Sequence, residues 1–211
     1  MMKIDKRTIK FTLIAFSLMM LFGISFQGNA GAVSNTINAG GNNSNWDKFT
    51  PQYTSINAGE TVKWINPMPV AEPHTVTFIK DTEMFPPLFA VFSILNNTKL
   101  TPAMPSPNIA PTIMPDQSNP NNTLVVVDNA RASAPVVIDD TRTNITYMQP
   151  NANYTFTGNE SYVNSGWMWP EGQAPPGAPP ISSFTVTFEK AGTYNYLCVI
   201  HPWMTGTIMV N

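Results

Sequence analysis

The residues best suited to chemistry lie in one short stretch near the end of the chain, residues 196–204. This stretch holds Cys198, the only cysteine, and His201, one of only two histidines. Two residues separate Cys198 from His201, and two more separate His201 from Met204. A single tight loop with this spacing can turn three donors toward one point. The donors favour copper, because a trigonal His₂Cys site with a long axial Met is typical of copper electron-transfer centres.

The other histidine, His74, lies far upstream and would complete this set of donors. For Cys198 the alternative is a buried, inert thiol. For Met204 the alternative is packing in the core, since the chain has twelve methionines. A lone cysteine cannot form an internal disulfide, and in a secreted chain it needs another explanation. Metal ligation provides one, so we predict a metal site formed by His74, Cys198, His201 and Met204.

Composition excludes several functional classes. The formal net charge is −2, and it becomes −5 without residues 1–32, which carry four of the 11 basic and one of the 13 acidic residues. An acidic chain is a poor nucleic-acid binder but suits a redox partner with a cationic face. Two histidines are too few for a trinuclear copper cluster beside a mononuclear site, and one cysteine excludes a centre bridged by two thiolates. With both histidines assigned to the metal, no Ser–His–Asp triad is credible.

Residues 1–32 have the pattern of a secretory signal peptide. Basic residues precede an uncharged apolar run at 11–26, and small residues follow at 30–32. The run is shorter than the roughly 20 residues of a spanning helix. We therefore predict cleavage and a secreted or extracytoplasmic protein, in the periplasm or at the cell surface. The alternative is an uncleaved anchor that would make the protein membrane-associated.

Short strands with turn signals surround the predicted ligands. Alternating or β-branched runs predict strands at residues 33–39, 53–57, 61–66, 74–79, 184–188, 193–197 and 206–210. Turn signals stand at Gly59 and Gly192. Helical periodicity is almost absent. The pattern predicts an all-β fold, an antiparallel β-sandwich.

The middle of the chain is less informative. Residues 85–95 could form a short helix or a buried strand, because an apolar run of this length suits both. The proline-rich residues 101–120 predict an extended surface loop. Further β-like runs stand at 123–127, 136–139 and 154–157. We predict a single domain, 33–211, with a long Pro/Asn-rich insertion at about 81–180 between the two ligand blocks.

The two ligand blocks, roughly residues 49–80 and 181–211, resemble those of the cupredoxins, the small blue copper proteins. In this chain, the segment that resembles the family's upstream histidine segment is VKWINPMPVAEPHTVTF. The segment that resembles the C-terminal ligand block of plastocyanin and amicyanin is FEKAGTYNYLCVIHPWMTGTIMVN. The chain also looks like secreted plastocyanin-like proteins of archaea.

The resemblance implies a Greek-key β-sandwich with one mononuclear type 1 copper ion. Cys198 would be the equatorial thiolate, His74 and His201 the imidazoles, and Met204 the axial thioether. The backbone N–H of Thr75 would donate to the cysteine sulfur. Many family members place Asn after the upstream histidine and Ser or Thr after the cysteine, and these side chains tie the two loops together. Here Thr75 and Val199 stand in those places, so we expect a weaker tie.

These features favour an electron carrier over an enzyme. The chain would cycle between Cu(I) and Cu(II) and exchange single electrons with redox partner proteins, membrane-bound ones included. One alternative is a copper oxidoreductase that acts on a small molecule such as a nitrogen oxide at an open copper position. Another is a copper-buffering surface protein that docks through the insertion. The sequence does not set the oligomeric state.

Overall fold

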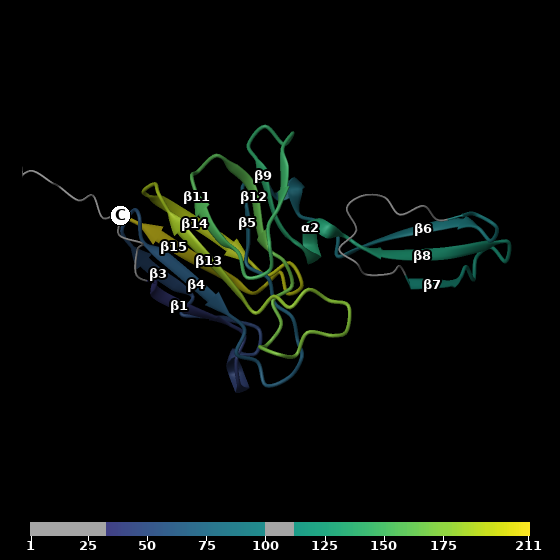
Figure 1. Cartoon of the computed structure of the whole chain (residues 1–211), viewed down its shortest axis with the longest axis horizontal. Coiled ribbons are helices and arrows are strands. Elements are labelled where there is room, and N and C mark those ends of the chain that lie inside the picture. The colour runs from purple at the N-terminus through teal and green to yellow at the C-terminus, as the bar shows by residue number, and fades with distance from the viewer. Residues whose placement is uncertain (1–32, 100–111) are drawn as a thin grey trace, which may run out of the picture. The chain divides into compact units, whose positions relative to one another are not determined.

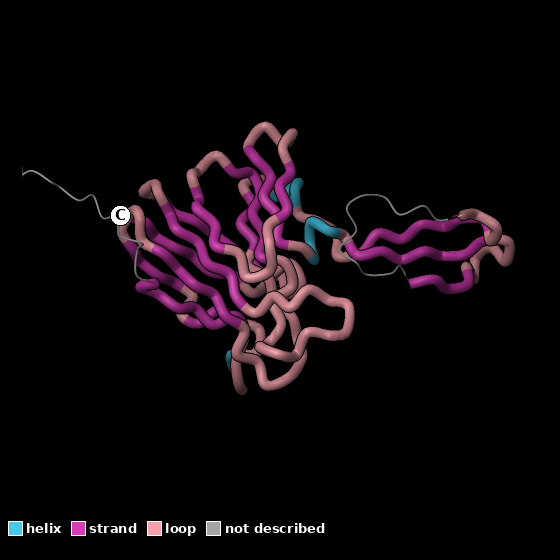
Figure 2. Tube along the Cα trace, in the orientation of Figure 1, coloured by secondary structure: helices cyan, strands magenta, loops and turns pink. Residues whose placement is uncertain are grey.

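The structure is a computed structural model that describes residues 33–99 and 112–211 (Figure 1). The predicted signal peptide, residues 1–32, lies outside the described residues. Strands account for most of the regular structure (Figure 2). Within the described ranges, no helix has the length and apolarity to cross a bilayer.

Two large sheets form the body of the molecule (Figure 1). The first has the order β11-β13-β4-β1-β2. Its strands are β1 (Val33–Ala39), β2 (Phe49–Thr50), β4 (Thr61–Ile65), β11 (Asn153–Phe156) and β13 (Ser183–Phe188). The second has the order β10-β9-β12-β5-β14-β15-β3. Its strands are β3 (Tyr53–Ile56), β5 (Thr77–Ile79), β9 (Pro135–Asp139), β10 (Ile145–Tyr147), β12 (Glu160–Ser165), β14 (Gly192–Leu197) and β15 (Thr205–Val210).

The all-β sandwich predicted from the sequence is confirmed. Most strand pairs are antiparallel, but β1 with β4, β11 with β13 and β15 with β3 are parallel. Parallel neighbours need a crossover connection. In each of these pairs, the chain between the two strands contributes at least one strand to the other sheet. The second strand can therefore run in the same direction as the first.

Alternating side chains build the core between the two sheets. In β13, Phe184, Val186 and Phe188 are buried while the residues between them are half-buried. Trp64 of β4 crosses the interface: its ring centroid lies 6.0 Å from that of Phe78 in β5 and 5.3 Å from that of Tyr196 in β14. These aromatic contacts join the first sheet to the strands that flank the predicted ligands.

Part of the predicted insertion belongs to the two sheets. Strands β9, β10 and β12 extend the second sheet beyond β5, and β11 extends the first. The sequence did not indicate β12, whose six residues are all buried and mostly polar. Their polar groups are paired inside: the Asn164 side-chain amide donates to the carbonyls of Ala132 and Arg131, and its oxygen accepts from Thr77 Oγ1. Internal hydrogen bonds of this kind make polar burial tolerable.

A third sheet has the order β6-β8-β7, with β6 at Phe89–Leu95, β7 at Thr112–Pro115 and β8 at Asn122–Asp128. Residues 85–95 thus contain a strand, but Val91 and Leu95 are exposed rather than buried. The loop prediction for 101–120 is wrong at β7, which pairs with β8 as an edge strand, a place where proline is tolerated. Its residues 101–111 lie outside the described residues. In the described part of the chain, the other elements are α2 (Ala130–Ser133) and two 3₁₀ turns, Asn43–Asn45 and Thr82–Met84.

Two neighbouring residues of β15 test how the sandwich is held together. Ile208 has no exposed surface, whereas Met209 beside it is 52% exposed. We expect Ile208→Ala to lower the free energy of unfolding by about 2–5 kcal/mol, because it leaves a cavity in the core. The matched control, Met209→Ala, should change it by no more than about 0.5 kcal/mol. Urea unfolding of both variants measures this, and equal losses would contradict the inward orientation of Ile208.

Candidate metal centre

The pairing of β5, β14 and β15 places Cys198 next to the segment that carries His74. Leu197, the last residue of β14, is opposite Thr77 of β5 and Thr205 of β15. The loop of residues 198–204 then closes on itself. The Cys198 N–H donates to the Met204 carbonyl at 2.9 Å, and the Met204 N–H donates to the His201 carbonyl at 2.8 Å. These bonds form the tight loop that the ligand spacing predicts.

His74 precedes β5 and is held by its backbone. Its N–H donates to the Met168 carbonyl at 3.0 Å, and its carbonyl accepts from the Met168 N–H at 2.8 Å. Its side chain has no exposed surface. Gly40, at φ +82°, lies directly against the ring: a Cβ there would come within 2.6 Å of His74 Nε2. Glycine is the residue that this close approach and this backbone conformation require.

Three of the four predicted ligands come together. The donor atoms of His74, Cys198 and His201 all lie within 4.8 Å of one another. Cys198 Sγ is 3.7 Å from His201 Nδ1. Metal bonds of about 2.0 Å to nitrogen and 2.3 Å to sulfur would space trigonal donors roughly 3.5–3.7 Å apart. The donor group therefore fits a metal ion with a small inward movement.

The electrostatics of the site match this donor set. The pKa of His74 is lowered to about 4, first by burial and then by the charge of His201, while Asp47 acts in the opposite direction. His74 is therefore a neutral imidazole near pH 7, which is the form that binds metals. Burial raises the pKa of the Cys198 thiol, and the Thr75 N–H, which donates to the sulfur at 3.3 Å, opposes that rise. Binding of a metal to Cys198 would therefore release a proton.

The tie between the two ligand loops differs from the expected one. Thr75 Oγ1 accepts from the backbone N–H of Val199 at 2.9 Å and also contacts Thr77 Oγ1 at 2.9 Å. The loops are thus joined by a direct hydrogen bond, although Val199 has no polar side chain. The expectation of a weaker tie considered only hydrogen bonds between side chains. The donor here is a backbone N–H, which the residue type at position 199 does not reveal.

Met204 is buried with 1% exposure, and its hydrogen bonds are made by its backbone. Its role as axial ligand stays a prediction. The sequence did not single out another buried methionine, Met68, whose Sδ accepts from the Gly41 N–H at 3.1 Å. A Cβ on Gly40 would meet both Met68 Sδ, at 2.8 Å, and His74 Nε2. Met68 therefore packs on the side of the His74 ring that carries Nε2.

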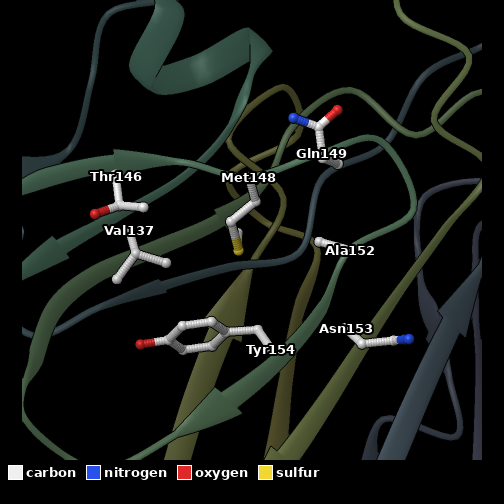
Figure 3. A pocket seen from close by; sticks show the side chains of 7 residues that line it. All are labelled: Val137, Thr146, Met148, Gln149, Ala152, Asn153 and Tyr154. Atoms are coloured by element: carbon white, nitrogen blue, oxygen red, sulfur yellow. The ribbon is translucent and has the colours of Figure 1, made fainter.

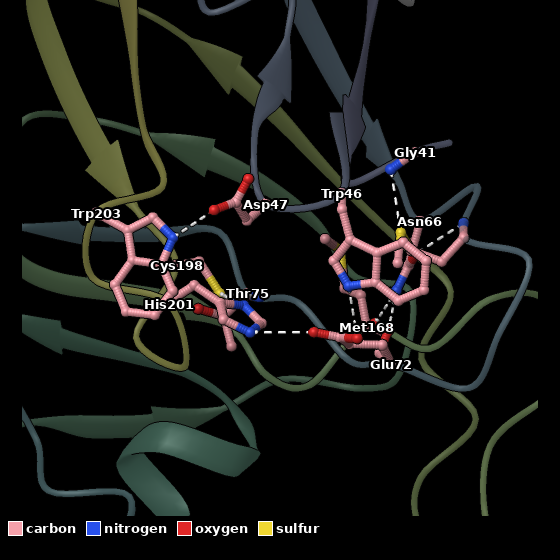
Figure 4. Close-up of polar contacts among 11 residues, drawn as sticks. Gly41, Trp46, Asp47, Asn66, Glu72, Thr75, Met168, Cys198, His201 and Trp203 are labelled. Carbon is pink, nitrogen blue, oxygen red and sulfur yellow. Dashed lines mark hydrogen bonds and ion pairs between the residues drawn. The ribbon is translucent and has the colours of Figure 1, made fainter. Parts of the chain in front are cut away.

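Two acidic residues that the sequence analysis also missed contact the ligand loop (Figure 4). Glu72 Oε1 lies 3.1 Å from His201 Nε2. Asp47 Oδ2 accepts from Trp203 Nε1 at 2.7 Å. Trp203 itself is 66% exposed, and its ring centroid is 5.5 Å from that of His201. No motif marks these acids, because they reach the loop from segments distant in sequence.

A separate hollow of about 420 Å³ lies between β9, β10 and β11 (Figure 3). It is lined by Val137, Thr146, Met148, Gln149, Ala152, Asn153 and Tyr154. None of these is a predicted ligand, and the lining contains no histidine, cysteine or carboxylate. Within residues 33–99 and 112–211, the cluster of potential metal ligands is His74, Cys198 and His201.

Among known proteins, no family model matches the chain and no curated protein matches it. Solved structures of amicyanin are similar to it. The Cu(I) form of one amicyanin mutant is 15% identical, with 87% of each chain covered and a TM-score of 0.39. The reduced state of another is 16% identical, with 83% of this chain and 80% of that chain covered and a TM-score of 0.37. TM-scores this low do not establish a shared fold, and the sandwich and the His-Cys-His group described above are observations on this chain alone.

The Thr75 tie leads to a prediction about the metal-free protein. Thr75→Val keeps the shape of the side chain but leaves the buried Val199 N–H without its acceptor. We expect a loss of about 1–3 kcal/mol in the free energy of unfolding and faster hydrogen exchange at the Val199 amide. The control Thr75→Ser retains the oxygen and should stay close to the wild type. If the valine variant matched the serine variant in both measurements, the tie would have no energetic role.

Gly40 and Gly59 form a matched pair for testing the packing around His74. Both have positive φ, but a Cβ on Gly59 would meet nothing within 4 Å. Alanine at either position should cost about 1–2 kcal/mol of backbone strain. Only Gly40→Ala should also displace the His74 ring and weaken Cu(II) binding, by roughly 10–100-fold. Competition titration with a copper chelator measures this, and equal affinities in the two variants would argue against the contact.

Proposed function

We propose that this chain is a type 1 copper protein that carries single electrons outside the cytoplasm. The observation that supports this most strongly is the buried imidazole of His74, which has no hydrogen-bond partner on either ring nitrogen among the residues that the structure describes. Buried polar groups nearly always have partners. An unpaired imidazole beside a buried thiol and a second imidazole indicates that its partner is a metal ion.

The donor set favours copper over the other common metals. Thiolate and imidazole suit copper, and a His₂Cys arrangement is that of copper electron-transfer sites. In this proposal Cys198, His74 and His201 hold the ion and Met204 is its axial ligand. Copper bound there would supply one-electron exchange between Cu(I) and Cu(II).

The chain keeps the ligands fixed during that exchange. His74 is held by its backbone bridge to Met168, and Cys198 is held by the loop closure and by the Thr75 N–H. Both side chains have no exposed surface, which excludes water. Ligands that cannot move and cannot be hydrated need little rearrangement when the charge changes. A rigid sandwich of this kind is therefore suited to fast electron transfer.

Electrons would enter and leave on the side of His201, the only one of the three clustered ligands that is not fully buried. Exposed Trp203 stands beside it and offers an apolar contact surface. We propose that redox partner proteins dock there, with a cationic face that suits the acidic chain. The extracytoplasmic location rests on the basic and apolar pattern of residues 1–32.

Spectroscopy of the Cu(II)-loaded chain tests this proposal. We expect an intense thiolate-to-copper charge-transfer band, narrow copper hyperfine splitting in the electron paramagnetic resonance spectrum, and a reversible one-electron wave. Because the ligands are buried, added azide should leave the spectra unchanged. Cys198→Ser should abolish the band, and a coloured, redox-active centre in that variant would refute the proposal.

The same experiment separates the alternatives. A band that azide shifts, together with turnover of a small molecule such as a nitrogen oxide, would indicate a copper oxidoreductase with an open position. Tight copper binding without a reversible wave would indicate a copper-buffering surface protein.

A further inference from the structure

The ring of His201 has a different partner on each nitrogen. Nδ1 is directed toward Cys198 Sγ, at 3.7 Å, while Nε2 lies 3.1 Å from Glu72 Oε1 (Figure 4). The side chains of His201 and Glu72 are only 15% and 28% exposed. The outer nitrogen of this predicted ligand is therefore covered by a carboxylate that belongs to the same chain.

Glu72 is itself fixed by several hydrogen bonds. Its second carboxylate oxygen accepts from Trp46 Nε1 at 2.7 Å, and its backbone N–H donates to the Val70 carbonyl at 2.7 Å. Its carbonyl accepts from the side-chain amide of Asn66 at 2.8 Å. A surface carboxylate with a single contact would move freely. In Glu72, by contrast, hydrogen bonds hold both the backbone and the carboxylate.

The buried side chain of Asn66 connects this carboxylate to the other histidine. The same Asn66 Nδ2 also donates to the Met168 carbonyl at 2.7 Å, and that carbonyl accepts from the His74 N–H at 3.0 Å. Asn66 Oδ1 accepts from the Met68 N–H at 3.0 Å. One amide, 5% exposed, thus aligns the loop that carries Glu72 with the bridge that holds His74.

We propose that Glu72 is a positioning residue for the ligand His201. A neutral imidazole carries one proton, and a carboxylate can only accept a hydrogen bond. The contact with Glu72 therefore keeps the proton on Nε2 and leaves the Nδ1 lone pair free toward Cys198, where the metal would bind. Carboxylate partners of this type orient metal-binding histidines and make them better donors.

Glu72 also places a negative charge beside the metal position. That charge favours the more positive Cu(II) state over Cu(I), so it should lower the reduction potential. This part of the inference rests on the proposed copper function. The orientation of His201 does not, because it is a property of the metal-free chain.

The test uses Glu72→Ala, Glu72→Gln and a matched control at an exposed acid, Glu189→Gln. In the metal-free protein, nitrogen NMR of the imidazole should show His201 protonated on Nε2 in the wild type. Glu72→Gln has one amide oxygen for two donors, His201 Nε2 and Trp46 Nε1, so it should keep only part of this preference. Glu72→Ala should give a mixture of the two tautomers. Glu189→Gln should match the wild type.

Copper measurements separate orientation from charge. Glu72→Ala should bind Cu(II) roughly 10–100-fold more weakly, as is usual for loss of a ligand's hydrogen-bond partner. Glu72→Gln should recover only part of that affinity, because its one acceptor oxygen serves two donors. The reduction potential should rise in both variants, because both lose the charge, and should not change in Glu189→Gln.

Unchanged tautomer and unchanged copper affinity in Glu72→Ala would overturn the inference. If Glu72→Ala does not fold, Trp46→Phe provides a second test, because it removes the hydrogen bond to Glu72 and keeps the carboxylate. It should shift the tautomer ratio and the copper affinity in the direction expected for Glu72→Ala, but by a smaller amount. No change in either quantity would also overturn the inference. A wild-type chain without a type 1 spectrum would refute the proposed function, while the NMR measurement would still decide the role of Glu72.

Discussion

The short pairing between β5 and β14 is the constraint on which the rest of the site depends. Only two residue pairs define it, Tyr196 with Phe78 and Leu197 with Thr77. A slip of one residue would turn each of these side chains to the opposite face of the sheet. The register is fixed because Tyr196 and Phe78 are both buried against Trp64. A core contact thus determines which residues stand together at the ends of the strands.

The site is stiff because its backbone groups are hydrogen-bonded within the protein. The two loops that carry the ligands are joined through Thr75, whose N–H and hydroxyl face Cys198 and the Val199 N–H. His74 is joined to a third segment through Met168. Such bonds add little stability individually, but breaking one leaves a buried group unsatisfied. The imidazole of His74, by contrast, has no partner among the described residues and stands beside the thiol.

The side of the site toward solvent differs in chemistry from its interior. Cys198 and His74 are fully buried, whereas His201 faces Glu72, and the neighbouring Trp203 donates a hydrogen bond to Asp47. Both acids come from parts of the chain that precede β5. The segment between β1 and β2 and the segment between β4 and β5 therefore each contact the ligand loop, and the outer face of His201 is acidic and aromatic rather than simply apolar.

The sequence by itself determined the fold class and most of the strands, and it singled out His74, Cys198 and His201, which the structure brings together. In a strand such as β13, the alternation of apolar and polar residues shows directly which face is buried. A single cysteine and two histidines leave few choices of ligand for a copper site. Tertiary structure decided what lacks a local signal. Strand β12 is polar and yet fully buried because its partners come from distant segments. Glu72, Asn66 and Gly40 matter only through contacts with residues far away in sequence, and the Thr75 tie uses a backbone donor that any residue could supply. Residue type fixes which chemistry is available, and only the register and packing of the strands fix which groups meet.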